Sequence, residues 1–212
     1  MPEPITLDLW SDIVCPWCWI GKHRLQRALE SAGLEARWRF RAYELGERSQ
    51  ERRPTLSHLA QKYGVSPDEA RGMLGRVRDL GAELGLDINP DVQKTAPTFD
   101  AHRLVKAAEA AALGPQLMER LHRAHFSEGR DLGDRGELAA LAAEAGLDLA
   151  AARRLLETDA YAADVEADEE RAAAQAIGGV PFTVINGRFA VSGAQSVETF
   201  RKAFARATEG AR

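Results

Sequence analysis

Two cysteines stand three positions apart in the motif Cys15-Pro16-Trp17-Cys18, and the chain contains no other cysteine. A cysteine attacks sulfur only as its thiolate, and a thiol at a helix N-terminus is more acidic because it faces unpaired backbone N–H groups. The spacing places Cys18 one helical turn after Cys15, close enough to form a disulfide. The motif therefore indicates redox chemistry, with Cys15 as the attacking sulfur.

The residues on either side of the motif predict a strand that leads into a helix. Ile5, Leu7 and Leu9 alternate with other residues as the buried face of a short strand does. Pro16 suits the first position of a helix, and apolar residues recur at helical spacing as far as Gly33. A C-x-x-C pair in this setting, in a chain without export features, indicates a thiol–disulfide site.

Three alternatives to a redox-active cysteine pair stay open. A structural disulfide across so short a loop would contribute little stability. A zinc site would need two more ligands, and His122 and His125 lie about a hundred residues away, outside the usual spacing of a zinc finger. The cysteines could also be inert core residues, although Pro16 and the junction between strand and helix favour a reactive pair.

The composition indicates a globular protein, because 45% of the 212 residues are hydrophobic. That content can form the buried core of one domain, or of one domain that carries an insertion. The net charge of −4 and the dispersed arginines give no support for nucleic-acid binding. The first ten residues lack the pattern of a secretory signal, and no run is long enough to cross a membrane. We therefore expect a cytoplasmic protein without membrane contacts, where a lone cysteine pair is more often catalytic than structural.

The middle of the chain predicts a second strand followed by a helical block. Residues 36–42 alternate between apolar residues and arginines, as a strand with one charged face does. From about Leu56 to Ile177 the pattern is almost wholly helical, and Ser66 and Glu69 are arranged as a capping box. The charges from Asp159 to Arg171 predict a solvent-exposed helix face.

The end of the chain predicts a hairpin and a last helix. The runs 180–185 and 188–192 flank Asn186-Gly187, the strongest short-range signal for a β-hairpin. Ser196 then precedes an amphipathic helix as its cap. The order of elements predicts a small α/β unit into which a helix-rich segment has been inserted.

With these features the chain resembles the DsbA-like thioredoxin family, and more closely its FrnE-like branch of thiol–disulfide oxidoreductases. The resemblance covers nearly the whole chain and rests on Ser11 to Gly21, on Phe99 to Leu104, and on Gly178 to Phe182 together with Val191 to Gln195. It implies an α/β thioredoxin fold with a large all-helical insertion between the second strand and a final helix-hairpin-helix portion. The expected thioredoxin-like domain comprises residues 1–50 and 161–212, and the expected helical insertion domain comprises residues 51–160.

The resemblance also implies the roles of the cysteines. Cys15 would be the nucleophile and Cys18 the resolving thiol of a protein disulfide oxidase or isomerase. Strongly oxidising members carry Pro-His between the cysteines, whereas this chain carries Pro16-Trp17. We therefore expect a reduction potential between those of a strong oxidase and thioredoxin.

A second segment of the expected site comes from the far end of the chain. The resemblance implies a cis peptide bond between Val180 and Pro181 that places the proline against the cysteines. The backbone of Val180 would then be free to pair with an extended peptide. Pro16, Trp17, Val180 and Pro181 are the expected substrate-binding and redox-tuning residues.

The expected chemistry needs no metal and no bound cofactor beyond the redox-active disulfide, with glutathione considered only as a co-substrate. The expected substrates are proteins that carry a dithiol or a disulfide. Because the chain has only two cysteines, its electron donor or acceptor must be another molecule, such as glutathione.

The main alternative is a glutathione-dependent isomerase or transferase of small aromatic substrates, which shares this architecture. Such enzymes typically carry serine in place of Cys15 and an Asp-Arg pair after the glycine that follows the last strand. Here Ala194-Gln195-Ser196 follows Gly193, so both features are missing. A thioredoxin-fold binding module, for zinc or for a protein partner, is the non-enzymatic alternative.

Several other side chains have simpler expected places. Trp17 is expected to be exposed beside the sulfurs, and Trp19 to be buried. His102 is expected to be a hydrogen-bonded histidine packed between the two parts of the chain. Met73 and Leu74 are expected to lie in the helical core.

Overall fold

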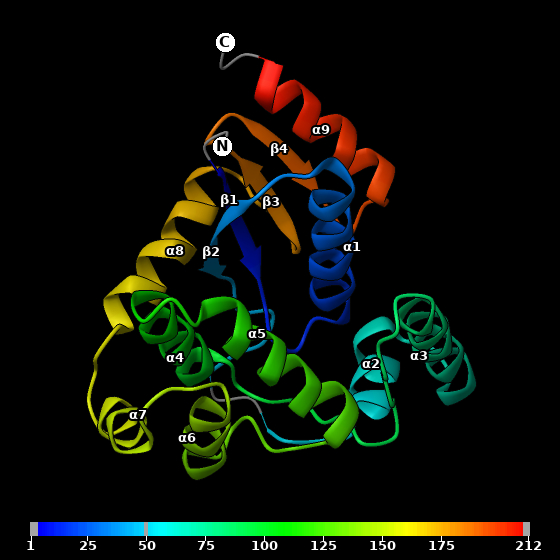
Figure 1. Ribbon diagram of the computed structural model, residues 1–212. Helices are drawn as coiled ribbons and strands as arrows, with labels where there is room; N and C mark the ends of the chain where they lie inside the picture. The colour runs from blue at the N-terminus through cyan, green and yellow to red at the C-terminus, as the bar shows by residue number, and fades with distance from the viewer. Residues whose placement is uncertain (1–3, 49–50, 210–212) are drawn as a thin grey trace.

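The computed structural model describes residues 4–48 and 51–209, and within them the strands form one mixed sheet (Figure 1). The strands are β1 (Ile5–Ser11), β2 (Ala36–Ala42), β3 (Phe182–Ile185) and β4 (Phe189–Ser192), in the spatial order β2-β1-β3-β4. β1 and β2 are parallel and are joined by α1 (Pro16–Ala32), whereas β3 runs antiparallel to both of its neighbours.

The remaining helices lie between β2 and β3 and at the end of the chain. They are α2 (Thr55–Tyr63), α3 (Pro67–Ala82), α4 (Phe99–Ala110), α5 (Gly114–Arg123), the π-helical turn η1 (Ala124–Glu128), α6 (Arg135–Glu144), α7 (Leu149–Leu156), α8 (Ala162–Ala174) and α9 (Val197–Glu209). This order confirms the predicted fold class, including the final helix-hairpin-helix portion. No helix in the described ranges has both the length and the apolar character of a membrane span.

Helices cover both faces of the sheet, because alternate strand residues point to opposite sides. On one side Leu7 and Ile185 are buried with Phe200 and Phe204 of α9 and with residues of α1. On the other side Trp10 packs with apolar residues of β3 and α8. Figure 1 shows α8 on one side of the sheet and α1 with α9 on the other.

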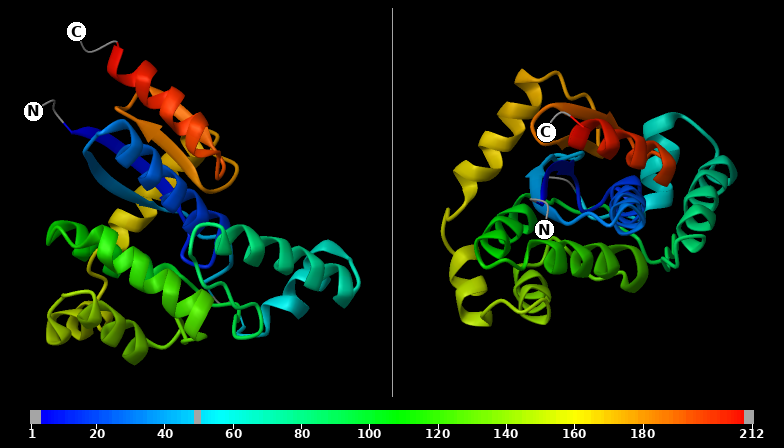
Figure 2. Two further views of the ribbon diagram at one scale, coloured as in Figure 1. Left: turned by 45° about the vertical axis from the view of Figure 1, so that its right-hand side comes forward. Right: turned by 45° about the horizontal axis from the view of Figure 1, so that its top comes forward.

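The largest buried cluster joins the sheet to the inserted helices. Leu9, Ile13 and Phe40 pack against side chains of α4, α5, α6 and α7. The residues of the two expected domains therefore share one hydrophobic core, and their division at residues 50 and 160 stays a prediction. Figure 2 shows α2 and α3 as a separate helical hairpin on the opposite side of the molecule from α6 and α7.

The local signals in the sequence are confirmed. Ser66 and Glu69 form the capping box of α3, and the Ser196 hydroxyl accepts the Thr199 N–H at 3.1 Å. Asn186 and Gly187 both have left-handed φ angles, of 51° and 66°, as a two-residue hairpin turn requires. Short-range backbone preferences are enough to determine these features.

Two predictions about the helical block need correction. Residues 83–98 are irregular rather than helical, because Gly85 is left-handed at φ 80° and the segment contains Pro90 and Pro97. The charge pattern places Asp168 on a solvent-exposed helix face, but Asp168 is only 2% exposed and is paired with Arg41 and Lys106. The pattern within α8 does not reveal these cations, because they come from elsewhere in the chain.

Candidate active site

Cys15 is the residue that precedes the first turn of α1. Its backbone is extended, and its carbonyl oxygen accepts the Cys18 N–H at 3.0 Å. Pro16 takes the first helical position, as the sequence predicted. The Cys15 thiol donates to the carbonyl oxygen of Val180 at 3.8 Å. This position places the sulfur at the N-terminus of the helix, where the first backbone N–H groups have no partner within the helix.

Cys18 lies one turn further along α1 and is completely buried. Burial, followed by the hydrogen bond and charge of Cys15, raises the pKa of the Cys18 thiol well above its usual range. The Ser11 hydroxyl and the Asp12 N–H lower that pKa by less. Both thiols are free. Cys18 therefore keeps its proton at neutral pH. Cys15 is also largely buried, at 4% exposed, but it lines a cavity that Cys18 does not reach.

The segment before β3 closes the site from the other side. The peptide bond between Val180 and Pro181 is cis, which confirms the prediction. The Pro181 carbonyl oxygen accepts the Gly193 N–H at 2.8 Å. A Cβ placed on Gly21 of α1 would lie 3.0 Å from Pro181 Cγ and 3.4 Å from the Cα of Ala194. Gly21 thus allows the close approach of α1 to this segment.

Trp17 of the motif and Trp19, which follows it, lie as predicted. Trp17 is 40% exposed beside Cys15, whereas Trp19 is 2% exposed. The Trp19 ring stacks on His122 and Phe126, with ring centroids 6.0 and 5.6 Å apart. Trp17 is available to a substrate, and Trp19 anchors α1 to the inserted helices.

A half-buried carboxylate on α5 completes this anchor. Glu119 accepts hydrogen bonds from Trp19 Nε1 at 3.1 Å and from Lys22 Nζ at 2.8 Å, and it lies 3.0 Å from His23 Nε2. Burial alone would raise the pKa of Glu119, but His23 and Lys22 outweigh it and hold that pKa well below its usual range. No motif in the sequence indicated this cluster.

Asp12 is turned toward the inserted segment. Its Oδ2 accepts the Leu45 N–H at 2.8 Å, and its Oδ1 lies 3.4 Å from His102 Nε2. His102 is 2% exposed, as expected for a packed histidine, but its Nε2 has no hydrogen-bond partner in the described chain. The expected buried position of His102 is confirmed, but the expected hydrogen bond is missing at Nε2.

Two further histidines lie in the interior near α1. Burial lowers the pKa of His122 to about 3 and that of His125 to about 4. Neither ring nitrogen of His122 has a hydrogen-bond partner among the described residues. Within residues 4–48 and 51–209, no group of three or more His, Cys, Asp and Glu side chains is arranged to hold a metal ion.

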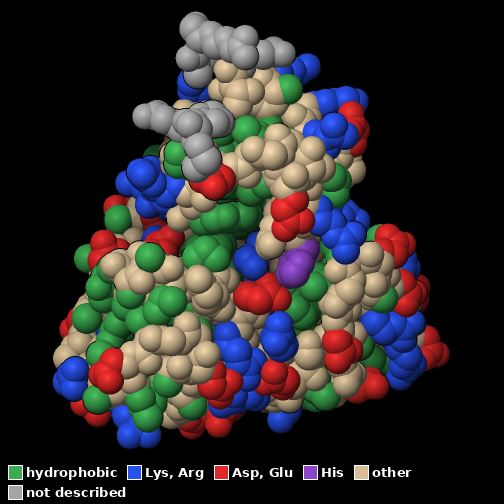
Figure 3. Space-filling view, viewed as in Figure 1, with side chains coloured by type: hydrophobic (Ala, Val, Ile, Leu, Met, Phe, Trp, Pro, Cys, Tyr) green, Lys and Arg blue, Asp and Glu red, His purple; other side chains and the backbone are tan. Residues whose placement is uncertain are grey.

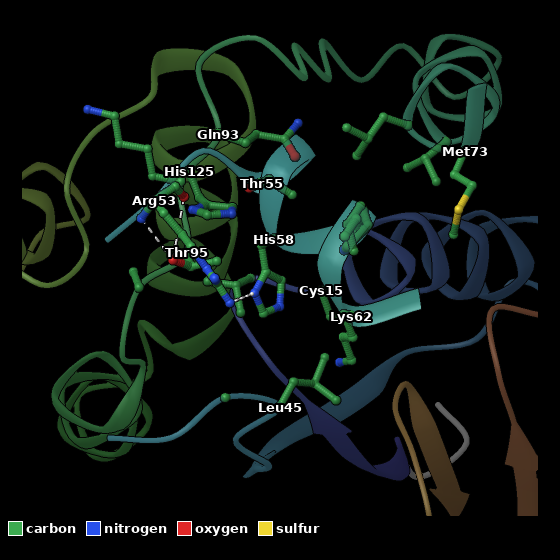
Figure 4. Close-up of a pocket in the computed structure, with 18 of the residues that line it drawn as sticks. Cys15, Leu45, Arg53, Thr55, His58, Lys62, Met73, Gln93, Thr95 and His125 are labelled. Carbon is green, nitrogen blue, oxygen red and sulfur yellow. Dashed lines mark hydrogen bonds between the residues drawn. The ribbon is translucent and has the colours of Figure 1, made fainter. Parts of the chain in front are cut away.

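A cavity of about 820 Å³ separates Cys15 from the hairpin of α2 and α3 (Figure 4). Its walls include Cys15, Pro16 and Trp17 from the start of α1, and His58 and Lys62 of α2. Met73 also lines it, so the expectation that Met73 belongs to the core is only partly right, whereas Leu74 is 5% exposed. The sequence did not indicate that this hairpin faces the cysteines, because the two segments are joined only by the tertiary structure.

Comparison with known proteins agrees with this geometry. The family model of the DSBA-like thioredoxin domain matches residues 6–205. A probable DsbA oxidoreductase from Streptomyces coelicolor, SCO1869, is 34% identical, with a TM-score of 0.91 over 97% of this chain and 90% of that chain. The uncharacterized protein YwbO of Bacillus subtilis (strain 168) is 29% identical over 94% of this chain and 95% of its own.

A more distant solved structure shares the fold. The cytosolic disulfide reductase DsbM from Pseudomonas aeruginosa, solved with GSH, has a TM-score of 0.65 and 22% identity over 96% of this chain and 99% of that chain. The sheet, the helical insertion and the cysteine pair at the start of α1 define a protein of the thioredoxin class. The chain belongs to the DsbA-like thioredoxin family of oxidoreductases. Its placement in the FrnE-like branch stays a prediction.

Proposed function

We propose that this protein is a thiol–disulfide oxidoreductase of the protein disulfide oxidase or isomerase type, with Cys15 as nucleophile and Cys18 as resolving thiol. One observation carries the proposal: Cys15 lies at the N-terminus of α1 and lines the cavity, while Cys18 is completely buried one turn behind it. Only Cys15 can meet a substrate sulfur, and only Cys18 can attack the product from within the protein.

The reaction follows from this arrangement. The Cys15 thiolate attacks one sulfur of a substrate disulfide, forms a mixed disulfide and releases the other sulfur as a thiolate. Cys18 then gives up its proton and attacks the Cys15 sulfur, which releases the second substrate thiol and closes the bond between Cys15 and Cys18. Run in reverse, the same steps oxidise a substrate dithiol. The electrons stay on sulfur throughout, so the exchange itself requires no metal or nucleotide.

The remaining site residues have distinct proposed roles. Pro16 starts the helix that stabilises the thiolate, and Trp17 offers an exposed apolar surface to the substrate. Val180 and Pro181 line the opposite side, where the backbone of Val180 would pair with an extended peptide.

We further propose protein dithiols or disulfides as substrates and glutathione as the external electron donor or acceptor, in the cytoplasm. Support comes from the Pseudomonas aeruginosa relative, which is described as a cytosolic disulfide reductase and was solved with GSH. An external molecule is needed in any case, because the chain has no third cysteine.

A redox titration tests the proposal. The protein is equilibrated in glutathione buffers, and the state of Cys15 and Cys18 is read by alkylation and mass. We expect a reversible two-electron transition that is absent in Cys15→Ser, and a trapped mixed disulfide in Cys18→Ser. A midpoint less negative than about −200 mV would indicate an oxidase or isomerase, and one near about −270 mV a reductant.

The opposite result has a clear meaning. A protein without this transition, but with glutathione-dependent isomerase activity that survives Cys18→Ser, would be an isomerase of small aromatic substrates instead. Stoichiometric zinc in the purified protein would favour a binding module.

A further inference from the structure

The cavity beside Cys15 differs in charge from the rest of the protein. The chain as a whole carries a net charge of −4, and on the face shown in Figure 3 acidic and basic side chains are interspersed. The described cavity wall carries Arg53, Lys62, Arg76 and Lys94, against two carboxylates, Glu47 and Glu51. The excess of positive charge therefore lies where a substrate would approach the nucleophile.

These cations are not committed to internal ion pairs. Among the described residues, none of the four has a carboxylate oxygen within 4.0 Å. Arg53 donates to the neutral side chains of Gln61 and His58, the latter at 2.9 Å. Burial and the charges of Arg53 and Lys62 lower the pKa of His58, which is consistent with a positive local potential.

Gln93 supplies a second, independent observation. It lines the same cavity, is only 4% exposed, and its Nε2 has no hydrogen-bond partner among the described residues. A buried amide donor without an acceptor costs free energy, so its position at a cavity wall indicates a ligand oxygen. Figure 4 shows Gln93 on the same side of the cavity as Arg53 and Thr55.

The rest of the wall is apolar and the space is limited. Trp17, Leu45, Leu59 and Met73 contribute apolar surface to the wall. A volume of about 820 Å³ is within the usual range for small-molecule sites, which is roughly 300–1,000 Å³. The occupant would therefore be a small molecule with both anionic and apolar parts.

We propose that this cavity binds a low-molecular-mass disulfide or thiol that carries carboxylate groups, and that Arg53, Lys62, Arg76 and Lys94 hold these groups while its sulfur faces Cys15. The proposal rests on the function proposed above and assigns a site to the external electron partner. A disulfide bound there accepts two electrons from the protein dithiol, which becomes the disulfide between Cys15 and Cys18. The two halves of the small molecule leave as thiols, each with one of the protons that the cysteines gave up.

Two reagents with matched chemistry and different charge test the proposal. The reduced full-length protein is mixed with 5,5′-dithiobis(2-nitrobenzoate), which carries two carboxylates, or with uncharged 2,2′-dithiodipyridine. Both report thiol attack by absorbance. Dividing each rate constant by that of free dithiothreitol corrects for intrinsic reactivity, and we expect the protein to favour the anionic reagent by about tenfold or more.

Variants identify the residues responsible. Lys62→Gln/Arg76→Gln removes two exposed cavity cations, and Arg153→Gln/Arg154→Gln removes two exposed cations of α7 as a matched control. In the cavity variant we expect the rate with the anionic reagent to fall about fivefold more than the rate with the uncharged reagent. The control variant should keep the same ratio of anionic-reagent rate to uncharged-reagent rate as the unmodified protein. Added salt should reduce that ratio in the unmodified protein.

The outcomes separate this inference from the proposed function. The inference is overturned if the unmodified protein shows no preference for the anionic reagent, or if the cavity variant keeps that preference. Either result leaves the proposed function intact, provided that the redox titration shows its two-electron transition. Failure of Cys15 to react with either reagent, together with no redox transition, would overturn both.

Discussion

The buried histidines make the protein sensitive to acid at the scale of single residues. The folded-state pKa of His122 is about 3, whereas an unfolded histidine titrates near about 6.5. Between these values the unfolded chain binds more protons than the folded one, so the free energy of unfolding falls as the pH drops below about 6.5. His125, with a folded-state pKa of about 4, acts in the same direction.

We predict that His122→Phe weakens this pH dependence. Phenylalanine preserves stacking with Trp19 and Phe126 but cannot bind a proton. The loss of unfolding free energy between about pH 7 and about pH 5 should decrease by up to about 2 kcal/mol. Urea titrations at several pH values measure the free energy of unfolding of both proteins. At about pH 8, where His122 and His125 are neutral, the difference between the two proteins reports only the change in packing. Parallel pH profiles for the two proteins would contradict the prediction.

At the scale of elements, the contact between α1 and the segment before β3 depends on the missing side chain of Gly21. A Cβ there would lie 3.0 Å from Pro181 Cγ, closer than packed atoms normally approach. The same contact keeps the Cys15 end of α1 beside Val180, since the thiol and that carbonyl are hydrogen-bonded.

We predict that Gly21→Ala lowers the free energy of unfolding by about 1–2 kcal/mol and slows the attack of Cys15 on a disulfide. Gly72→Ala on α3 is the matched control, because nothing lies within 4 Å of its added methyl group. That control should stabilise by up to about 1 kcal/mol, through reduced flexibility of the unfolded chain. Equal effects of the two substitutions on stability and on the exchange rate would rule out the contact as the cause.

At the scale of the whole molecule, Asp168 of α8 connects three distant parts of the chain. It is buried and pairs with Arg41 of β2 at 3.1 Å, and with Lys106 of α4. Its Oδ2 also accepts the Ala42 N–H at 3.1 Å. The sheet, the inserted helices and the C-terminal part of the chain therefore meet at one carboxylate, in addition to their shared hydrophobic core.

We predict that Asp168→Asn destabilises the protein by about 3 kcal/mol, because the buried carboxylate shared by Arg41, Lys106 and Arg171 is lost while the shape is kept. Glu170→Gln, on an exposed position of the same helix, should change stability by less than about 0.5 kcal/mol. Chemical denaturation followed by circular dichroism measures both. Because the hydrophobic core is continuous, we expect a single unfolding transition for each variant. An unaltered denaturation midpoint for Asp168→Asn would refute the structural role of Asp168.

Local signals in the sequence determined the elements and the reactive pair. The alternation in residues 5–9, Pro16 and Gly33, the capping serines and Asn186-Gly187 act through neighbouring backbone atoms, so pattern alone predicted β1, α1, β2 and the hairpin. The order of these elements predicted the inserted helical segment, and the cis bond at Pro181 followed from resemblance to a family. These predictions needed no knowledge of long-range contacts.

The tertiary structure alone decided the surroundings of the sulfurs. The Cys15 thiol meets the carbonyl of Val180 across 165 positions of sequence, and Trp19 meets Glu119 across 100. The cations and the unpaired Gln93 of the cavity come from α2, α3 and the irregular segments that flank them. Such contacts depend on how whole elements pack, and no pattern within a short window of sequence records that packing.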